Sequence, residues 1–302
     1  MSDKKLISIS GPTAIGKTKL AIKLAKSLNS EVISFDSRQF YKEMSIGTAV
    51  PLEIELNEVK HHFIQHKSIL DPYTVYDFSV EANKLIKKLF KVYDNIILVG
   101  GSYMFLKSII YGIDEMPKIP NEFRNNLNEK FKINGIEYLQ SILIAKDPEY
   151  YEKVDINNPR RLIRALEIIE FTKKPYTSFL TYNKERLYNH YSIALNTDRN
   201  RLYEKINNRV DLMINSGLID EAKDLYKFKD NNALRTVGYK ELFNYFSNQY
   251  SKVFAINEIK KNTRRFAKKQ ITWLRNSDEK HQWIDIDYDI EDIVKNLDNK
   301  IF

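Results

Sequence analysis

Cysteine is absent from this chain of 302 residues, which excludes disulfide bonds and thiolate zinc sites. Any bound metal ion is then held by oxygen or imidazole ligands, a donor set that suits Mg²⁺ on a phosphate. The sequence also lacks a run of eighteen apolar residues, and Met1 leads into a strand rather than an apolar targeting region. We therefore expect a monomeric globular protein in the cytoplasm, with no membrane partner.

Positive charge exceeds negative charge, with 48 Lys and Arg against 40 Asp and Glu and a formal net charge of +8. This balance favours an anionic partner larger than a nucleotide, such as nucleic acid. Lysine-rich proteomes also produce basic proteins without such a partner, so charge alone leaves the question open. Hydrophobic residues make up 43% of the chain, enough for a sizeable core in one large or two modest domains.

Alternating apolar and amphipathic segments predict an α/β fold in the N-terminal third. Strands rich in Ile and Val are expected at 4–10, 31–35 and 95–99, and helices at 17–28 and 79–92. This order is typical of a doubly wound, mostly parallel sheet, which binds its ligand at the carboxyl ends of the strands. Together with a match to the phosphate-loop pattern G-x-x-x-x-G-K-[ST] at 11–18, it predicts a fold of the P-loop NTPase type.

Two prolines in the segment 114–120 interrupt this pattern, and the sequence that follows them is mainly helical in character. We predict an inserted helical domain at 115–185, set into a core formed by 1–114 and 186–302. In the second part of the core, 190–196 is expected to be a strand that returns to the sheet, followed by a helical C-terminal part.

The most specific motif is the phosphate-binding loop G-x-x-x-x-G-K-[ST], between the first expected strand and the first expected helix. Its glycines allow successive backbone N–H groups to face one anion, and the positive end of the helix points to the same place. Lys17 supplies a cation, and the hydroxyl of Thr18 is a candidate Mg²⁺ ligand. We predict a diphosphate or triphosphate site formed by Gly11, Pro12, Thr13, Ala14, Ile15, Gly16, Lys17 and Thr18.

Two further segments are expected at the same edge of the sheet. Asp36 follows the second strand and is a candidate general base, although a capping role in a turn remains open. Gly100-Gly101-Ser102 follows the strand 95–99, where many P-loop ATPases and GTPases carry an acid that positions Mg²⁺. The missing acid argues against a motor or switch. Ser102 can donate a hydrogen bond to a phosphate or a leaving oxygen, and a tight turn without a ligand is the alternative.

Basic residues form three clusters on expected helices. The first puts Arg160, Arg161 and Arg164 on one helical turn, opposite an apolar face. The second contains Arg209, at the edge of an apolar stripe, where a guanidinium can clamp a diphosphate through two hydrogen bonds. The third is the segment 260–275. Solvated helix faces also carry such charge, but three clusters together favour a surface that binds a polyanion.

Three histidines, His61, His62 and His66, have a spacing that invites comparison with metal sites. No carboxylate or third ligand accompanies them at a recognisable spacing, so we expect them to pack or cap.

Taken together, these segments resemble the bacterial tRNA dimethylallyltransferases, also called tRNA isopentenyltransferases. Matching blocks follow the order of that family from Gly11 to Arg275, and this ordered set is far more specific than the phosphate loop alone. Besides the loop, the blocks are 36–41, 46–49, 61–63, 76–78, 100–102, 158–167, 237–241 and 268–275.

The resemblance implies transfer of the dimethylallyl group of dimethylallyl diphosphate to the exocyclic N6 amine of the adenosine 3′-adjacent to the anticodon, in tRNAs that read codons beginning with U. It also implies Mg²⁺, with Thr18 as a ligand. The loop then holds a donor whose diphosphate departs, while Lys17, Arg209 and Mg²⁺ neutralise the departing charge. Asp36 would accept the proton of the amine. Ser102, which stands where the family usually has Thr, would hydrogen-bond the reacting region.

The resemblance further implies that an anticodon stem-loop is bound with its target adenine unstacked. Residues 115–185 would clamp this stem-loop and move on binding. The expected tRNA-binding residues are Asp36, Ser37, Arg38, Gln39, Ser102, Arg124, Arg160, Arg161, Leu162, Ile163, Arg164, Arg235, Gly238, Tyr239, Lys268, Lys269, Gln270, Trp273 and Arg275.

The sequence departs from the family pattern in the wall of the site. After the paired glycines the family usually has Thr-Gly-Leu-Tyr, whereas this chain has Ser102-Tyr103-Met104-Phe105. Tyr103 in place of glycine is expected to alter the fit of the prenyl chain or the base.

Two other functions remain as alternatives. A P-loop nucleotide or small-molecule kinase shares the loop and a helical lid, but does not need the later basic blocks. A non-enzymatic RNA-binding protein that uses a nucleotide as a switch is disfavoured by the missing acid after Val99.

Overall fold

The computed structural model describes residues 4–181 and 184–298 of the chain. The chain divides into two compact units, one formed by 1–112 with 186–302 and the other by 113–185. The smaller unit contains the segment 115–185 in which the sequence predicts helices. Among the described residues, no helix is long and apolar enough to cross a membrane.

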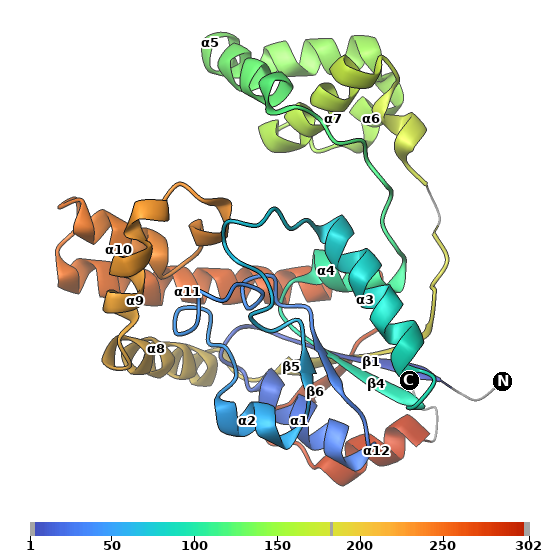
Figure 1. Ribbon diagram of the computed structural model, residues 1–302, viewed down its shortest axis with the longest axis vertical. Helices are drawn as coiled ribbons and strands as arrows, with labels where there is room; N and C mark the ends of the chain where they lie inside the picture. Colours follow the sequence, from blue (N-terminus) through green and yellow to red (C-terminus); the bar gives the residue numbers. More distant parts are fainter. Residues whose placement is uncertain (1–3, 182–183, 299–302) are drawn as a thin grey trace. The chain divides into compact units, whose positions relative to one another are not determined.

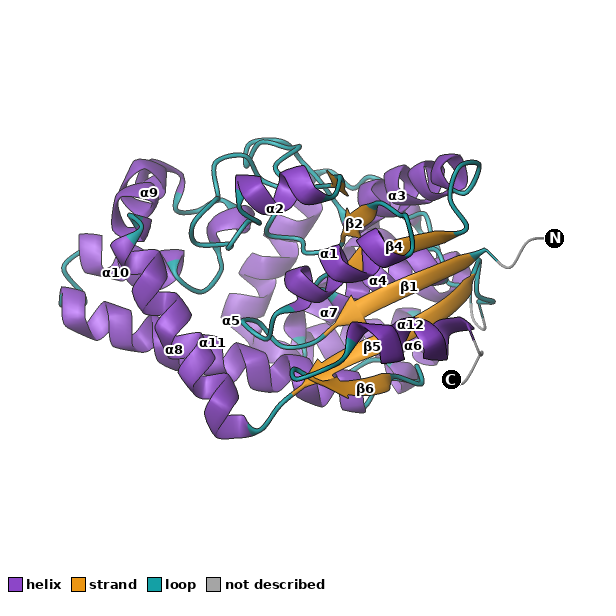
Figure 2. Cartoon of the chain, turned by 90° about the horizontal axis from the view of Figure 1, so that it is seen from below, coloured by secondary structure: helices purple, strands orange, loops and turns teal. Residues whose placement is uncertain are grey.

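The larger unit is built on one sheet (Figure 1). Within the described residues its six strands are β1 (Lys5–Ser10), β2 (Val32–Ser34), β3 (His61–His62), β4 (Asn95–Val99), β5 (Asn189–Asn196) and β6 (Gln282–Asp285), in the order β3-β2-β4-β1-β5-β6. Every pairing is parallel, so all strands direct their carboxyl ends to the same edge (Figure 2). The predicted doubly wound α/β fold is confirmed.

Helices complete the larger unit. In chain order they are α1 (Lys17–Ser27), α2 (Glu53–Glu58), α3 (Val75–Leu89), α4 (Tyr103–Ile110), α8 (Arg199–Asn215), α9 (Leu218–Leu225), α10 (Tyr239–Phe246), α11 (Lys252–Arg275) and α12 (Ile290–Asp298). The helices α8 to α11 pack around a cluster of their own that includes the fully buried Tyr239. The expected strand after residue 186 and the helical C-terminal part are both confirmed.

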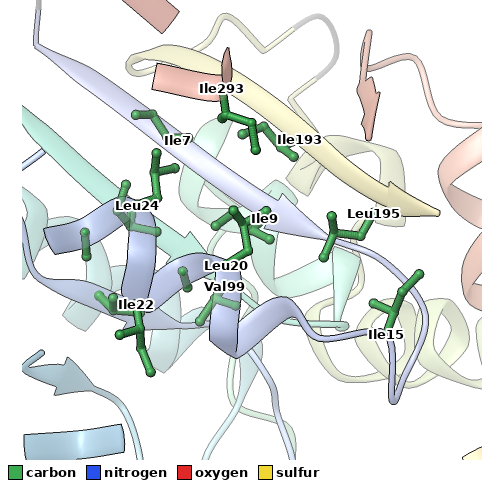
Figure 3. Close-up of a cluster of buried hydrophobic side chains, with 14 of the residues drawn as sticks. Ile7, Ile9, Ile15, Leu20, Ile22, Leu24, Val99, Ile193, Leu195 and Ile293 are labelled. Atoms are coloured by element: carbon green, nitrogen blue, oxygen red, sulfur yellow. The ribbon is translucent and has the colours of Figure 1, made fainter. Parts of the chain in front are cut away.

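The central strand β1 is apolar enough to be covered on both faces. It pairs with β4 on one side and β5 on the other, and all six of its residues are buried. Ile7 and Ile9 pack with Leu20 and Leu24 of α1 (Figure 3), whereas Leu6 belongs to the cluster formed with α3 and α4. Side chains that alternate between two covered faces are typical of a central parallel strand. This packing fixes the end of β1, where the phosphate loop starts.

The smaller unit is helical and has its own core. It contains α5 (Asn121–Lys146), α6 (Pro148–Lys153), α7 (Pro159–Thr172) and a short 3-10 helix, η1 (Tyr176–Phe179). The side chain of Asn158 caps α7 by accepting from the Arg161 amide, and Pro159 occupies the first helical position. Leucines and isoleucines of α5 and α7 pack together, including Leu143, Leu162 and Leu166.

Two edge strands, β3 and β6, are not predicted by the sequence. Both are short, and their residues are only half-buried or exposed. Neither shows an apolar run or a clear alternation, which are the signals by which strands are recognised. Both therefore depend on pairing with β2 and β5 rather than on local sequence.

Candidate active site

The phosphate loop joins the end of β1 to the start of α1. The φ angles of Gly11, Ala14 and Gly16 are 149°, 65° and 106°. The φ of Gly11 favours glycine, and a Cβ there would also lie 3.1 Å from the carbonyl oxygen of Leu195, a tight contact. Within the described residues no side chain caps α1 at Gly16. The N–H groups of the first turn are therefore free to bind an anion.

Two cations face this loop. The Nζ of Lys17 donates to the carbonyl of Pro12 at 2.9 Å, and Nη1 of Arg209 lies 3.4 Å from the hydroxyl of Thr13. Burial lowers the pKa of Lys17 to about 8, the charge of Asp36 opposes this shift, and Arg209 adds to it. Burial also lowers the pKa of the Arg209 guanidinium. Two desolvated cations side by side form a strong site for a polyvalent anion.

Asp36 follows β2 and acts electrostatically on both cations. Its Oδ1 accepts from the Arg38 amide at 3.1 Å, and its own amide donates to the hydroxyl of Ser34 at 3.3 Å. The turn role that the sequence leaves open is therefore present. It occupies one carboxylate oxygen and is compatible with proton transfer at the other.

Ser102 joins the turns that follow β2 and β4. Its hydroxyl accepts from the Ser37 amide at 3.2 Å and lies 3.0 Å from the Ser37 hydroxyl. The segment after β4 also needs its first glycine, because a Cβ at Gly100 would lie 2.5 Å from the ring of Phe35. The two strand ends are thus held close together at the edge of the sheet.

Gln270 of α11 connects the phosphate loop to the turn after β4. Its Oε1 accepts from the Thr13 amide at 2.9 Å, and its Nε2 donates to the carbonyl of Gly101 at 3.0 Å. A Cβ at Gly101 would lie 2.4 Å from Nε2, so this approach requires glycine. The sequence predicts Gln270 as a tRNA contact; the structure shows it in this bridge, with its side chain also lining the cavities described below.

Two adjoining cavities meet at these residues. One has a volume of about 410 Å³ and is lined by the phosphate loop, and the other has a volume of about 680 Å³ and is lined by the turns after β2 and β4 and by α8, α10 and α11. They share part of their lining, including Thr13, Asp36, Thr48, Arg209 and Gln270. A phosphate-bearing ligand in the first cavity and a second reactant in the other would meet beside Asp36.

Glu221 fixes a loop in the wall of the larger cavity. Its carboxylate accepts from the amides of Ser45, Ile46 and Gly47 at 3.0, 2.7 and 2.9 Å, and from the hydroxyl of Tyr239 at 2.7 Å. Nothing in the sequence near Glu221 marks it as a functional residue. Only the matching block 46–49 indicates that its partner loop matters.

Several predicted tRNA-binding residues make hydrogen bonds within the larger unit. The guanidinium of Arg38 donates to the carbonyl of Ala233 at 2.8 Å, and the amide of Gln39 donates to the carbonyl of Ala49 at 2.8 Å. Tyr239 is 0% exposed, so the prediction that its side chain binds tRNA is wrong. Its ring packs against Gly47 and its hydroxyl donates to Glu221, so it stabilises the loop in the wall of the larger cavity. Gly238 is buried and precedes α10, Arg235 is exposed, and both residues line the larger cavity.

In the smaller unit, the predicted tRNA-binding residues fall into three groups. Leu162 and Ile163 are 0% and 6% exposed, and the prediction that they bind tRNA is wrong because their side chains form the core of this unit. Arg124 and Arg164 both pair with the buried Glu167, at 2.6 and 2.5 Å. Arg160 and Arg161 are exposed, and among the described residues neither forms an ion pair.

On α11, four of the predicted tRNA-binding residues remain exposed: Lys268, Lys269, Trp273 and Arg275. Of these, Lys269 lines the larger cavity. The helix therefore contributes both a bridge within the site, through Gln270, and cationic side chains at the surface.

The histidines make packing and hydrogen-bond contacts, and one of them pairs with a carboxylate distant in the sequence. The Nε2 of His62 is hydrogen-bonded to Glu31, and His66 sits edge-on to the rings of Phe40, Phe63 and Tyr73. Burial lowers the pKa of His66 to about 4. The described residues contain no group of three or more His, Cys, Asp or Glu that could hold a metal ion.

Known proteins match the chain along almost its whole length. The sequence pattern described as IPP transferase matches residues 39–277. A protein of Christiangramia forsetii named tRNA dimethylallyltransferase is 51% identical over 297 residues, or 98% of each chain. One of Flavobacterium johnsoniae with the same name is 48% identical over 99% of this chain and 100% of its own.

Solved structures match the fold as well. The tRNA isopentenylpyrophosphate transferase of Bacillus halodurans is 37% identical with a TM-score of 0.71, over 99% of this chain and 95% of its own. A eukaryotic dimethylallyltransferase acting on tRNA is 24% identical, has a TM-score of 0.80 and is covered over 77% of its length, which supports the fold.

Proposed function

The chain belongs to the IPP transferase family, and on that premise we propose that it transfers the dimethylallyl group of dimethylallyl diphosphate to the exocyclic N6 amine of the adenosine 3′-adjacent to the anticodon. The observation that carries this proposal is the pair of cavities that meet beside Asp36, one lined by the phosphate loop and one roomy enough for a nucleobase. The kinase alternative does not account for the family match over residues 39–277 or for the two relatives at 51% and 48% identity.

The phosphate loop is the proposed site of the leaving group. As the allylic carbon–oxygen bond breaks, negative charge builds up on the departing diphosphate. That position is surrounded by Lys17, Arg209 and the N–H groups at the start of α1. Because the site is partly desolvated, their electrostatic interactions with the diphosphate are stronger than they would be in water. The bound anion also favours protonated Lys17, whose pKa of about 8 in the free protein is held down by burial.

Asp36 is the proposed proton acceptor. The amine nitrogen forms a bond to the allylic carbon, loses one proton to a carboxylate oxygen of Asp36, and the diphosphate departs with the electron pair of the broken bond. The Arg38 amide holds the carboxylate in place by donating to Oδ1 at 3.1 Å, and the hydroxyl of Ser34 fixes the backbone of Asp36 by accepting from its amide at 3.3 Å. Ser102 keeps the neighbouring turn against it.

Mg²⁺ is the proposed metal ion, with the hydroxyl of Thr18 as its protein ligand. The absence of a multi-ligand His or carboxylate cluster among the described residues suits Mg²⁺, which is usually held by substrate phosphates, waters and one or two protein oxygens. When bound, it supplies charge neutralisation for the diphosphate. The proposed macromolecular partner is an anticodon stem-loop from tRNAs that read codons beginning with U.

The direct experiment is mass analysis of anticodon-loop fragments after incubation of unmodified tRNA with the protein, Mg²⁺ and dimethylallyl diphosphate. We expect the adenosine to gain one dimethylallyl group. A parallel sample with ATP in place of the prenyl donor should show no phosphate added to the RNA. Phosphate transfer from ATP, or an unmodified adenosine with the prenyl donor, would contradict the proposal.

Replacing Asp36 by Asn tests the proton acceptor with little change in shape. The amide oxygen can still accept from the Arg38 amide, so the turn should persist, but Asn cannot take up the proton. Single-turnover prenyl transfer should slow by roughly 10²- to 10⁴-fold, the usual contribution of a general base. Donor affinity, measured with dimethylallyl thiodiphosphate, should change far less. A near-parental transfer rate would show that Asp36 is not the base.

A further inference from the structure

A third cavity in the larger unit plays no part in the reaction described above. Its volume is about 380 Å³, and its lining is almost wholly apolar and rich in aromatic rings. One wall is a single face of α11, where Phe266, Lys269, Gln270 and Trp273 recur at helical spacing. The start of α4 forms another part of the lining, and the ring of Tyr103 there meets Trp273 edge to face.

We propose that this cavity binds a second unstacked nucleobase of the RNA, next in the strand to the target adenosine. The inference rests on the proposed function. Gly101, Ser102 and Gln270 line both this cavity and the larger one beside Asp36, so the two cavities adjoin. A strand that delivers one base to Asp36 brings a neighbouring base to the adjoining cavity.

The lining suits a base of any identity. Trp273 and Tyr103 offer aromatic rings, and bases stack on such rings with little regard to sequence. Lys269 is exposed and lines both cavities, so it can pair with the phosphate that joins the two nucleotides. An apolar pocket with one cation matches the chemistry of a nucleotide, which joins a flat apolar ring to a charged phosphate.

The prenyl chain of the donor is a poorer occupant. Trp273, Phe266 and Met104 are 43%, 47% and 62% exposed, so the walls of this cavity face solvent. An allylic group that ionises during the reaction must be shielded from water, or it is hydrolysed. A stacked base tolerates a solvated edge.

The chain offers a clean reporter, because it has two tryptophans, Trp273 and Trp283. In Trp283→Phe protein, the fluorescence of Trp273 should be quenched by an unmodified anticodon stem-loop. A stem-loop made abasic at the nucleotide directly 5′ of the target, and another made abasic directly 3′ of it, identify the neighbour. One of the two should bind without quenching and roughly 5- to 150-fold more weakly, as expected for one lost stacking contact.

Two results would overturn the inference. One is full quenching by both abasic stem-loops. The other is quenching by dimethylallyl thiodiphosphate alone, which would make the prenyl chain the occupant. Neither test requires a variant of the pocket itself, so loss of folding cannot imitate the result.

Variants of the pocket give a second measurement. Trp273→Ala should raise KM for the stem-loop by roughly 5- to 150-fold, Trp273→Phe should restore most of the loss, and Trp283→Ala should have no such effect. Unchanged KM in Trp273→Ala contradicts the inference. Prenyl transfer is followed in the same samples. If quenching depends on the base but no prenyl group is transferred, the base-binding pocket is supported and the proposed function is refuted. If the prenyl group is transferred but quenching does not depend on the base, the proposed function is supported and the base-binding pocket is refuted.

Discussion

Gly101→Ala tests the bridge that Gln270 makes between the phosphate loop and the turn after β4. The added methyl group would lie 2.4 Å from Nε2 of Gln270, at the far end of a flexible side chain. Since Gly101 is outside the positive-φ residues, alanine adds no backbone strain. We expect the Gln270 side chain to turn away and give up its hydrogen bonds to the Thr13 amide and the Gly101 carbonyl.

The magnitude follows from the two lost hydrogen bonds. Each contributes about 0.5–1.5 kcal/mol, so their loss amounts to about 1–3 kcal/mol. If the bridge serves to hold the loop in its reactive arrangement, kcat/KM for the donor falls by roughly 5- to 150-fold. Gln270→Ala should cause a loss of similar size, because it removes the same two bonds.

The assay is a double-mutant cycle on kcat/KM, with Gln249→Ala as a control for the same substitution at an exposed position. The double variant Gly101→Ala with Gln270→Ala should lose no more than either single variant, since the bridge can be broken only once. Losses that add in the double variant would show that the two residues act separately, and would refute the reasoning.

Three further predictions concern charge and packing. The pKa of Lys17 is about 8 in the free protein, and binding of an anion favours its charged form. The affinity for dimethylallyl thiodiphosphate should therefore fall by up to about tenfold per pH unit above that pKa. Calorimetry that shows constant affinity above that pKa would contradict this. Replacing Arg160 and Arg161 by Ala should reduce the slope of log K against log salt for tRNA by about 1.4–1.8, and an unchanged slope would remove both from the interface. Leu162→Ala should destabilise the smaller unit by about 2–5 kcal/mol in urea unfolding, and a surface-like loss below about 0.5 kcal/mol would contradict its place in the core.

The sequence predicts those features of the site that depend on neighbouring residues. The phosphate loop, the strand before it and the helix after it are contiguous, and Asp36 follows directly from its place after β2. A parallel sheet brings such strand ends together, so their meeting is predictable as well. Contacts between residues far apart in the chain are not predictable in this way. Gln270 of α11 contacts Thr13, and Glu221 of α9 contacts Gly47, only because the chain folds so that these helices pack beside the loops.

Matching blocks also mislead when a whole segment is assigned one role. Leu162 and Ile163 stand between arginines in such a block, but the helical spacing that puts the arginines on one face puts these side chains on the other. Tyr239 is polar at one end only, and the structure uses that end to hold Glu221. In each case the side chain is buried, Leu162 and Ile163 in the core of the smaller unit and Tyr239 in that of the larger unit.

The central claim is that the phosphate loop holds a diphosphate that leaves and does not donate phosphate. The most direct test is a single-turnover reaction of the protein with tRNA, Mg²⁺ and dimethylallyl diphosphate labelled in both phosphates, in which labelled products and prenylated tRNA are counted together. The account predicts one intact diphosphate released for each dimethylallyl group gained. Label on the RNA, or release of single phosphate in step with the reaction, would contradict it.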